Sequence, residues 1–151
     1  ERNALLSTAA SLTRRMYCEE SSDERKALFN ELSFAILDDS RDSSLSLMAA
    51  EFFSAIADEF SNILTDQKAH PMWSQVAGAQ FSYNELPLVL QTCLKSIGAF
   101  CDAIVSGRQT DSVQLQIVIR ALSTASTILS GDALFPSPLN TTRAIRFRMF
   151  A

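Results

Sequence analysis

The side chains that could do chemistry are few and widely spaced along the chain. His70 is the only histidine, and it lies in a Lys-Ala-His-Pro stretch with no cysteine nearby in sequence. A Cys–His or Ser–His nucleophile would have to use that one imidazole, and a zinc site would need four ligands at suitable spacing. No phosphate-binding glycine pattern occurs either. We therefore expect no catalytic residues, no metal and no cofactor, with His70 an ordinary surface-loop residue.

Adjacent acidic residues are the other candidates for acid–base chemistry. They occur at three places: Glu19-Glu20, Asp38-Asp39 and Asp58-Glu59. The first two pairs fall at the ends of expected helices, where solvated charge is the usual explanation. Because no base, nucleophile or metal accompanies these pairs, the sequence does not predict an enzyme.

The three cysteines, Cys18, Cys93 and Cys101, form no CxxC pair. Eight residues of helix would place Cys93 and Cys101 about 12 Å apart, which is too far for a disulfide. We expect all three to be buried, reduced thiols in a reducing compartment.

Composition narrows the class of protein. The chain has 151 residues, of which 47% are hydrophobic and 20% charged, as is usual for a globular domain rather than a disordered one. Only 4 Gly and 4 Pro are present, which favours long helices. The formal charge of −4 argues against nucleic-acid binding, which needs a basic face. We see no apolar run long enough for membrane insertion.

Apolar residues recur at helical spacing in five stretches, which predicts helices over about 2–18, 23–38, 43–64, 84–106 and 110–130. Gly107 and Gly131 are expected to end the last two. We expect the following residues to face inward on the first, third and fifth helices: Leu5, Ala9, Leu12 and Met16; Leu45, Met48, Ala49, Phe52, Ile56, Phe60 and Ile63; Leu115, Val118, Ile119, Leu122, Ala125 and Leu129.

A long connection is expected over residues 65–83. A structureless loop of this size is unusual in a compact domain. We therefore expect its aromatic residues Trp73 and Phe81 to fold back over apolar surface.

These elements predict an all-α fold. Short links make the first three helices antiparallel neighbours. Hairpins over about 23–64 and 84–130, preceded by the second helix of another hairpin, fit a HEAT-like α-solenoid, and a compact helical bundle is the alternative. Because Glu1 lies within an amphipathic pattern, we expect a single segment, 1–151, of a longer chain. The exposed apolar end faces of this segment should then lie early in the first helix and near residues 147–150.

The order of features resembles the amino-terminal HEAT region of exportins in the importin-β superfamily. The sequence RNALLSTAASLTRR over residues 2–15 precedes a turn, then LFNEL over 28–32, and then a long stretch that ends AIADEFS at 55–61. The stretch from Phe81 to Leu90, and residues 122–130 followed by Phe135-Pro136, continue the likeness. One departure is that Met16-Tyr17 follows the basic pair Arg14-Arg15 at the place where the family usually has an aromatic residue.

The resemblance implies a nuclear transport receptor found in both nucleus and cytoplasm. Its partners would be a Ran-type GTPase in the GTP form and protein cargo. The helices near 2–18, 43–64 and 110–130 would line the inner surface. Glu51 and Asp58, seven residues apart on one helix face, could meet a basic surface of the GTPase. Arg14 and Arg120 could meet acidic partners. The alternative is that all four are ordinary solvated side chains.

Two other functions stay open at this point. A self-assembling, coat-like or scaffold protein would have a closed core without open apolar end faces. A HEAT-like adaptor without GTPase binding cannot be told from a transport receptor by sequence alone. An enzyme is the least supported class.

Overall fold

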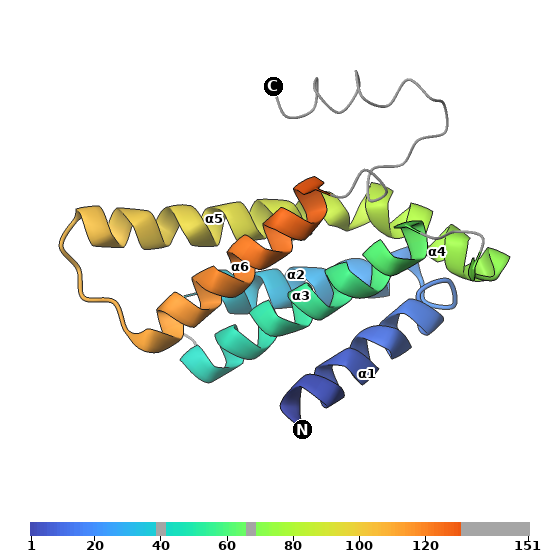
Figure 1. The fold of residues 1–151 in the computed structure, drawn as a ribbon, viewed down its shortest axis with the longest axis horizontal. Coiled ribbons are helices and arrows are strands. Elements are labelled where there is room, and N and C mark those ends of the chain that lie inside the picture. Colours follow the sequence, from blue (N-terminus) through green and yellow to red (C-terminus); the bar gives the residue numbers. More distant parts are fainter. Residues whose placement is uncertain (39–41, 66–68, 131–151) are drawn as a thin grey trace, which may run out of the picture.

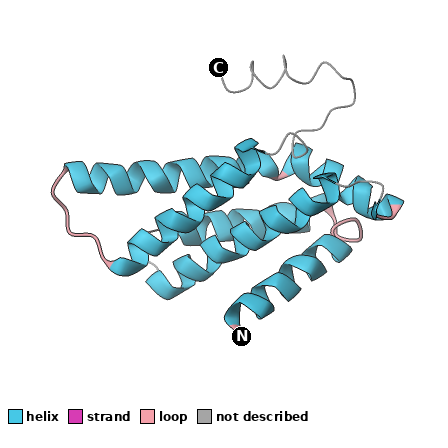
Figure 2. Cartoon of the chain, in the orientation of Figure 1, coloured by secondary structure: helices cyan, strands magenta, loops and turns pink. Residues whose placement is uncertain are grey.

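The computed structural model describes residues 1–38, 42–65 and 69–130. Within these ranges the regular elements are all α-helices, which confirms the predicted all-α class (Figure 1; Figure 2). The helices are α1 (Arg2–Met16), α2 (Ser22–Leu37), α3 (Ser43–Thr65), α4 (Met72–Asn84), α5 (Leu86–Val105) and α6 (Ser112–Ser130). Three predictions fall outside the described residues. They are the helix end at Gly131, the turn at Phe135-Pro136 and the apolar end face at 147–150.

The ends of these helices follow from local chemistry. Ser21 and Glu24 form a capping box at the start of α2, in which each side chain accepts a hydrogen bond from the other residue's backbone N–H. Asp111 and Gln114 make the same reciprocal bonds at the start of α6. Gly107 follows α5 with φ of 72°, a conformation that favours glycine, so the predicted stop is confirmed.

The predicted loop over 65–83 is wrong, because α4 occupies most of it. The buried face of α4 consists mainly of small side chains: Ser74, Ala77, Gly78, Phe81 and Ser82. Such a face has the three–four spacing of a helix but little hydrophobicity, so an apolar periodicity cannot reveal it. Phe81 is fully buried as expected, whereas Trp73 remains 44% exposed.

The helices pack in two layers. Helix α3 lies between α1 and α6, and α2 packs on α5 (Figure 1). Within the chain, α2–α3 and α5–α6 form hairpins, and α4 fills the space against α1, α3 and α5. Although α1 and α2 are consecutive, each packs mainly on α3 rather than on the other. This packing is consistent with a helical solenoid or a bundle.

An aromatic cluster forms the centre of the core. The rings of Phe60 and Phe81 stack with centroids 4.1 Å apart, and Tyr17 meets Phe60 edge-on at 5.6 Å. Phe29 extends the cluster, with its ring 5.9 Å from Phe81 and 6.1 Å from Phe53. All five side chains are at most 1% exposed. These contacts join α2, α3, α4 and the α1–α2 turn into one core.

Several predicted inward faces are wrong. On α1, Leu5, Leu12 and Met16 are exposed, and Ala10 is the buried residue. On α6 four predicted core residues are about half-exposed: Leu115, Ile119, Leu122 and Leu129. Two other predicted core residues, Val118 and Ala125, are buried as expected, together with Ala121 and Thr124. On both helices the large apolar residues are the exposed ones, and an apolar pattern alone does not show which face the neighbouring helices cover.

The central helix α3 follows its prediction more closely. Ala49, Ile56 and Phe60 are buried, while Leu45 and Met48 near its start are 39% and 45% exposed. The side chain of Ile63 lies outside the described residues.

The cysteines also depart from expectation. Cys93 is buried, and burial raises the pKa of its thiol to about 12. Cys18 and Cys101 are exposed, so the expectation of three buried thiols is wrong for two of them.

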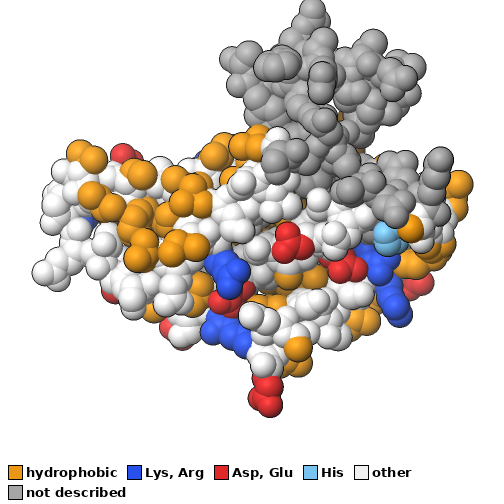
Figure 3. Space-filling model, viewed as in Figure 1, with side chains coloured by type: hydrophobic (Ala, Val, Ile, Leu, Met, Phe, Trp, Pro, Cys, Tyr) orange, Lys and Arg blue, Asp and Glu red, His pale blue; other side chains and the backbone are white. Residues whose placement is uncertain are grey.

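Apolar side chains gather on the outer surface of the α5–α6 hairpin, at the left of Figure 3. Together with Leu5 on α1, which is 71% exposed, they leave apolar surface at both ends of the helix stack. By length and composition alone, α5 and residues 112–129 of α6 could also cross a membrane, contrary to our reading of the sequence. The buried face of α5 is partly polar, however, because Thr92 hydrogen-bonds to Ser33 of α2 at 2.7 Å.

Candidate partner-binding surface

Charged residues of α3 form ion pairs with α1. On the α1 side, Arg2 Nε lies 2.9 Å from Glu51 Oε2, and Arg14 Nε lies 2.7 Å from Glu59 Oε1. In Figure 3 acidic and basic side chains are interleaved along this part of the surface. Two of the predicted partner-binding residues, Glu51 and Arg14, therefore make internal ion pairs between α1 and α3.

Arg14 is the more deeply engaged of the two. Its side chain is only 13% exposed, and Nη1 donates a hydrogen bond to Ser74 Oγ at 2.9 Å. The guanidinium also lies over the ring of Trp73, 5.5 Å from the centroid. Arg14 thus holds α1, α3 and α4 together, and little of its donor capacity faces solvent.

Asp58 and Arg120 lie on the other side of α3. Both residues are exposed, one on α3 and the other on the adjacent helix α6. Partial burial of the carboxyl raises the pKa of Asp58, and the nearby positive charge of Arg120 opposes this rise. Of the four predicted residues, these two present their charged groups most openly to a partner.

The structure therefore places the four predicted residues on one layer but in two different settings. Glu51 and Arg14 fix α1 on α3, whereas Asp58 and Arg120 form an exposed pair of opposite charges between α3 and α6. Such a surface can pair with both acidic and basic groups of a partner. Exposed charges of this kind contribute more to the association rate and to specificity than to affinity.

A buried polar cluster was missed by the sequence reasoning. The Tyr17 hydroxyl donates a hydrogen bond to the carboxylate of Glu85, which is 3% exposed. The guanidinium of Arg25 lies over the Tyr17 ring at 4.6 Å, with Nε 3.9 Å from Glu85 Oε1. Its Nη1 donates to the backbone carbonyls of Tyr17 and Glu20, at 2.8 Å and 2.6 Å.

This cluster joins the α1–α2 turn to the junction of α4 and α5. Burial raises the pKa of Glu85, although the hydrogen bond from Tyr17 and the charge of Arg25 both oppose the rise. Burial and the adjacent carboxylate raise the pKa of Tyr17. The cluster is enclosed, so we assign it to fold stability. No local pattern could have revealed it, because Tyr17 and Glu85 are 68 positions apart.

Other chemistry is sparse in the part of the chain that the structure describes. No group of three or more His, Cys, Asp or Glu side chains there is arranged to hold a metal ion. His70 precedes α4 and is partly exposed, and its backbone carbonyl accepts a hydrogen bond from Gln75 Nε2 at 2.9 Å. Comparison with protein-family models, curated proteins and solved structures found no match.

Proposed function

We propose that this chain is a protein-binding segment of a nuclear transport receptor that binds a Ran-type GTPase in its GTP form and protein cargo. The observation that carries the proposal is the layered packing, with α3 between α1 and α6, and α2 on α5. Helical repeats bind partners through extended layers of this kind. The likeness of residues 2–15 and 28–61 to exportins supports the transport role specifically.

The proposed contact is the seam between α3 and α6. Asp58 and Arg120 are exposed there and attract each other. Each could instead form an ion pair with an oppositely charged group on the GTPase. Glu51 and Arg14 would act indirectly, because their ion pairs with Arg2 and Glu59 fix the position of α1. Cargo release would follow from coupling between cargo binding and GTPase binding.

The test compares charge variants of the longest available protein that contains this chain. Binding to a Ran-type GTPase loaded with a non-hydrolysable GTP analogue would be measured for Asp58→Arg and Arg120→Asp. We expect each to weaken binding at least fivefold, with a larger loss at low salt. The matched controls are Asp102→Arg and Lys95→Asp on α5, which also change exposed charges but outside this seam. Equal effects of seam and control variants would contradict the proposed contact.

A self-assembling scaffold is the second candidate, although the exposed apolar residues on α1 and on the α5–α6 hairpin argue against the closed core expected of it. It predicts that sedimentation velocity shows larger species as the protein concentration rises. Particles that keep the mass of a single chain over a hundredfold concentration range would rule it out. A HEAT-like adaptor would bind cargo proteins without distinguishing the GTPase from a control protein.

A further inference from the structure

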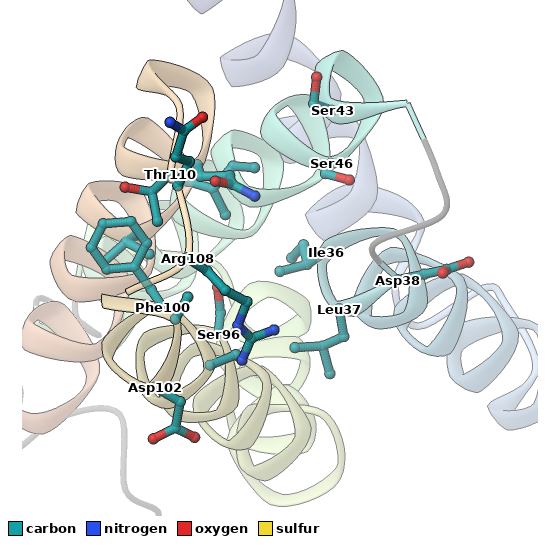
Figure 4. Close-up of a pocket in the computed structure, with 16 residues that line it drawn as sticks. Ile36, Leu37, Asp38, Ser43, Ser46, Ser96, Phe100, Asp102, Arg108 and Thr110 are labelled. Atoms are coloured by element: carbon teal, nitrogen blue, oxygen red, sulfur yellow. The ribbon is translucent and has the colours of Figure 1, made fainter. Parts of the chain in front are cut away.

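A cleft of about 360 Å³ lies where the α2–α3 and α5–α6 turns meet, away from the α3–α6 charge pair (Figure 4). Its apolar lining comes from the end of α2, the second half of α5 and the start of α6. The larger apolar side chains are those of Ile36, Leu37, Phe100, Ile117 and Val118. A volume of this size is at the lower end of the range for specific ligand sites and suits one or two side chains.

A positive charge points into this cleft. Figure 4 shows the Arg108 guanidinium directed inward, beside Ser96 and Leu37, while the carboxylates of Asp38 and Asp102 point away. Arg108 follows Gly107, and its backbone N–H donates to the Ala103 carbonyl at 2.9 Å, which fixes the turn. Among the described residues no acidic group lies within ion-pair distance of its side chain.

The other polar groups of the cleft differ in their availability. Ser46 Oγ donates to the Ala35 carbonyl at 2.7 Å, and Gln114 Oε1 accepts the Asp111 N–H at 3.0 Å. The Ser96 side chain is nearly buried, yet across the described ranges it makes no hydrogen bond. Arg108 and Ser96 are therefore donors available inside the cleft, so a ligand should supply an acceptor, preferably a charged one.

We propose that this cleft binds a short acidic–apolar segment of a partner polypeptide. A carboxylate would accept hydrogen bonds from Arg108 and Ser96, and a neighbouring aliphatic side chain would contact Leu37 and Phe100. The choice of a polypeptide rests on the proposed protein-binding function. The choice of a carboxylate rests on its charge complementarity with Arg108. The site is separate from the GTPase contact, so either proposal can fail without the other.

The test uses two short peptides and the full chain labelled with ¹⁵N. The probe is acetyl-Gly-Leu-Asp-Leu-Gly-amide, and the matched neutral peptide has Asn in place of Asp. We expect the Asp peptide to bind at least tenfold more tightly, because a charge-assisted hydrogen bond is stronger than a neutral one. Its amide chemical-shift changes should centre on Ser96, Phe100 and Ile117.

Variants then assign the carboxylate contact. Arg108→Glu should weaken binding of the Asp peptide at least tenfold, and Arg108→Lys should weaken it less, because charge remains but the planar fork is lost. Ser96→Ala should weaken it severalfold. Arg15→Glu, the same charge change at an exposed position on α1, should leave it unchanged. Arg108 is exposed in a turn, so its variants should fold normally.

Three results would overturn the proposal. Equal affinity for the Asp and Asn peptides would mean that the carboxylate is not recognised. Unchanged affinity in Arg108→Glu, or shifts centred elsewhere, would place binding outside the cleft. Tighter binding of octanoate than of the Asp peptide would assign the site to free carboxylic acids rather than to polypeptides. No GTPase is present in these measurements, so their outcome is independent of the transport role.

Discussion

Replacing Tyr17 with phenylalanine tests the buried cluster at the α4–α5 junction. The change removes a single oxygen from a fully buried ring and keeps its contacts with Phe60 and Phe81. Within the described residues the Tyr17 hydroxyl makes the one hydrogen bond to the Glu85 carboxylate. What remains is the positive charge of Lys26 and that of Arg25, whose Nε at 3.9 Å is too far for a hydrogen bond.

The expected cost follows from the charge of that carboxylate. A hydrogen bond to a charged group contributes about 1.5–3 kcal/mol, and a buried charge left without it adds a desolvation penalty. We therefore expect Tyr17→Phe to lower the free energy of unfolding by about 2–3 kcal/mol at pH 7. For a chain of this length, that lowers Tm by about 5–10 °C.

The destabilisation caused by Tyr17→Phe should be smaller at low pH. The direction of this pH dependence follows from the pKa of Glu85. Burial already raises that pKa in the folded state, so Glu85 contributes stability at low pH that is lost as pH rises through its folded pKa. Removing the Tyr17 hydroxyl removes one influence that lowers the pKa, so the variant's pKa should rise further. On acidification the variant therefore gains more stability than the wild type. The difference between their free energies of unfolding becomes smaller.

Urea unfolding followed by circular dichroism at 222 nm, at pH 7 and pH 5, measures this difference. Tyr83→Phe is the matched control, because Tyr83 is the other tyrosine and is 78% exposed. We expect the control to change stability by less than about 0.5 kcal/mol. A Tyr17→Phe effect as small as the control, or one that is equal at both pH values, would refute the reasoning. In a Glu85→Gln background the cost should also fall, since the buried charge is gone.

Three further predictions concern packing, ion pairs and thiols. Phe81→Ala should cost about 3–5 kcal/mol in urea unfolding, because its ring is fully buried and stacked on Phe60, and a cost below about 1 kcal/mol would contradict this core. Arg14→Ala should lower the free energy of unfolding by about 2 kcal/mol, because contacts with Glu59, Ser74 and Trp73 are lost. Arg2→Ala should lower it by less than about 1 kcal/mol, because the Arg2 side chain is 53% exposed. Equal losses in the two variants would show that Arg14 is no more important for stability than Arg2. In the native protein Ellman's reagent should modify Cys18 and Cys101, and Cys93 should react only after unfolding, because it is buried with a pKa of about 12; rapid reaction of all three thiols would disprove this placement.

Helix positions could be predicted from the sequence wherever one apolar face dominates. The apolar stripe of α3 and the glycine after α5 define their helices well. Helix α4 could not be predicted in this way, because its buried residues are mostly serine, alanine and glycine. The faces of α1 and, in part, α6 were assigned wrongly, because their large apolar residues are exposed and small residues are buried in their place.

The sites depend on contacts between distant parts of the chain, and local patterns do not encode these. Arg14 and Glu51 look solvated on a helical projection, yet partners on other helices engage them. Tyr17, Arg25 and Glu85 come from three separate segments. The cleft at Arg108 forms only where two interhelical turns meet.

The most direct test of the central claim compares the affinity of the longest available protein for a Ran-type GTPase in its two nucleotide states. The measurement is isothermal titration calorimetry with the GTPase loaded either with a non-hydrolysable GTP analogue or with GDP. The proposed function predicts at least tenfold tighter binding of the GTP form. Equal affinity for the two forms, or binding of neither, would contradict a Ran-dependent receptor.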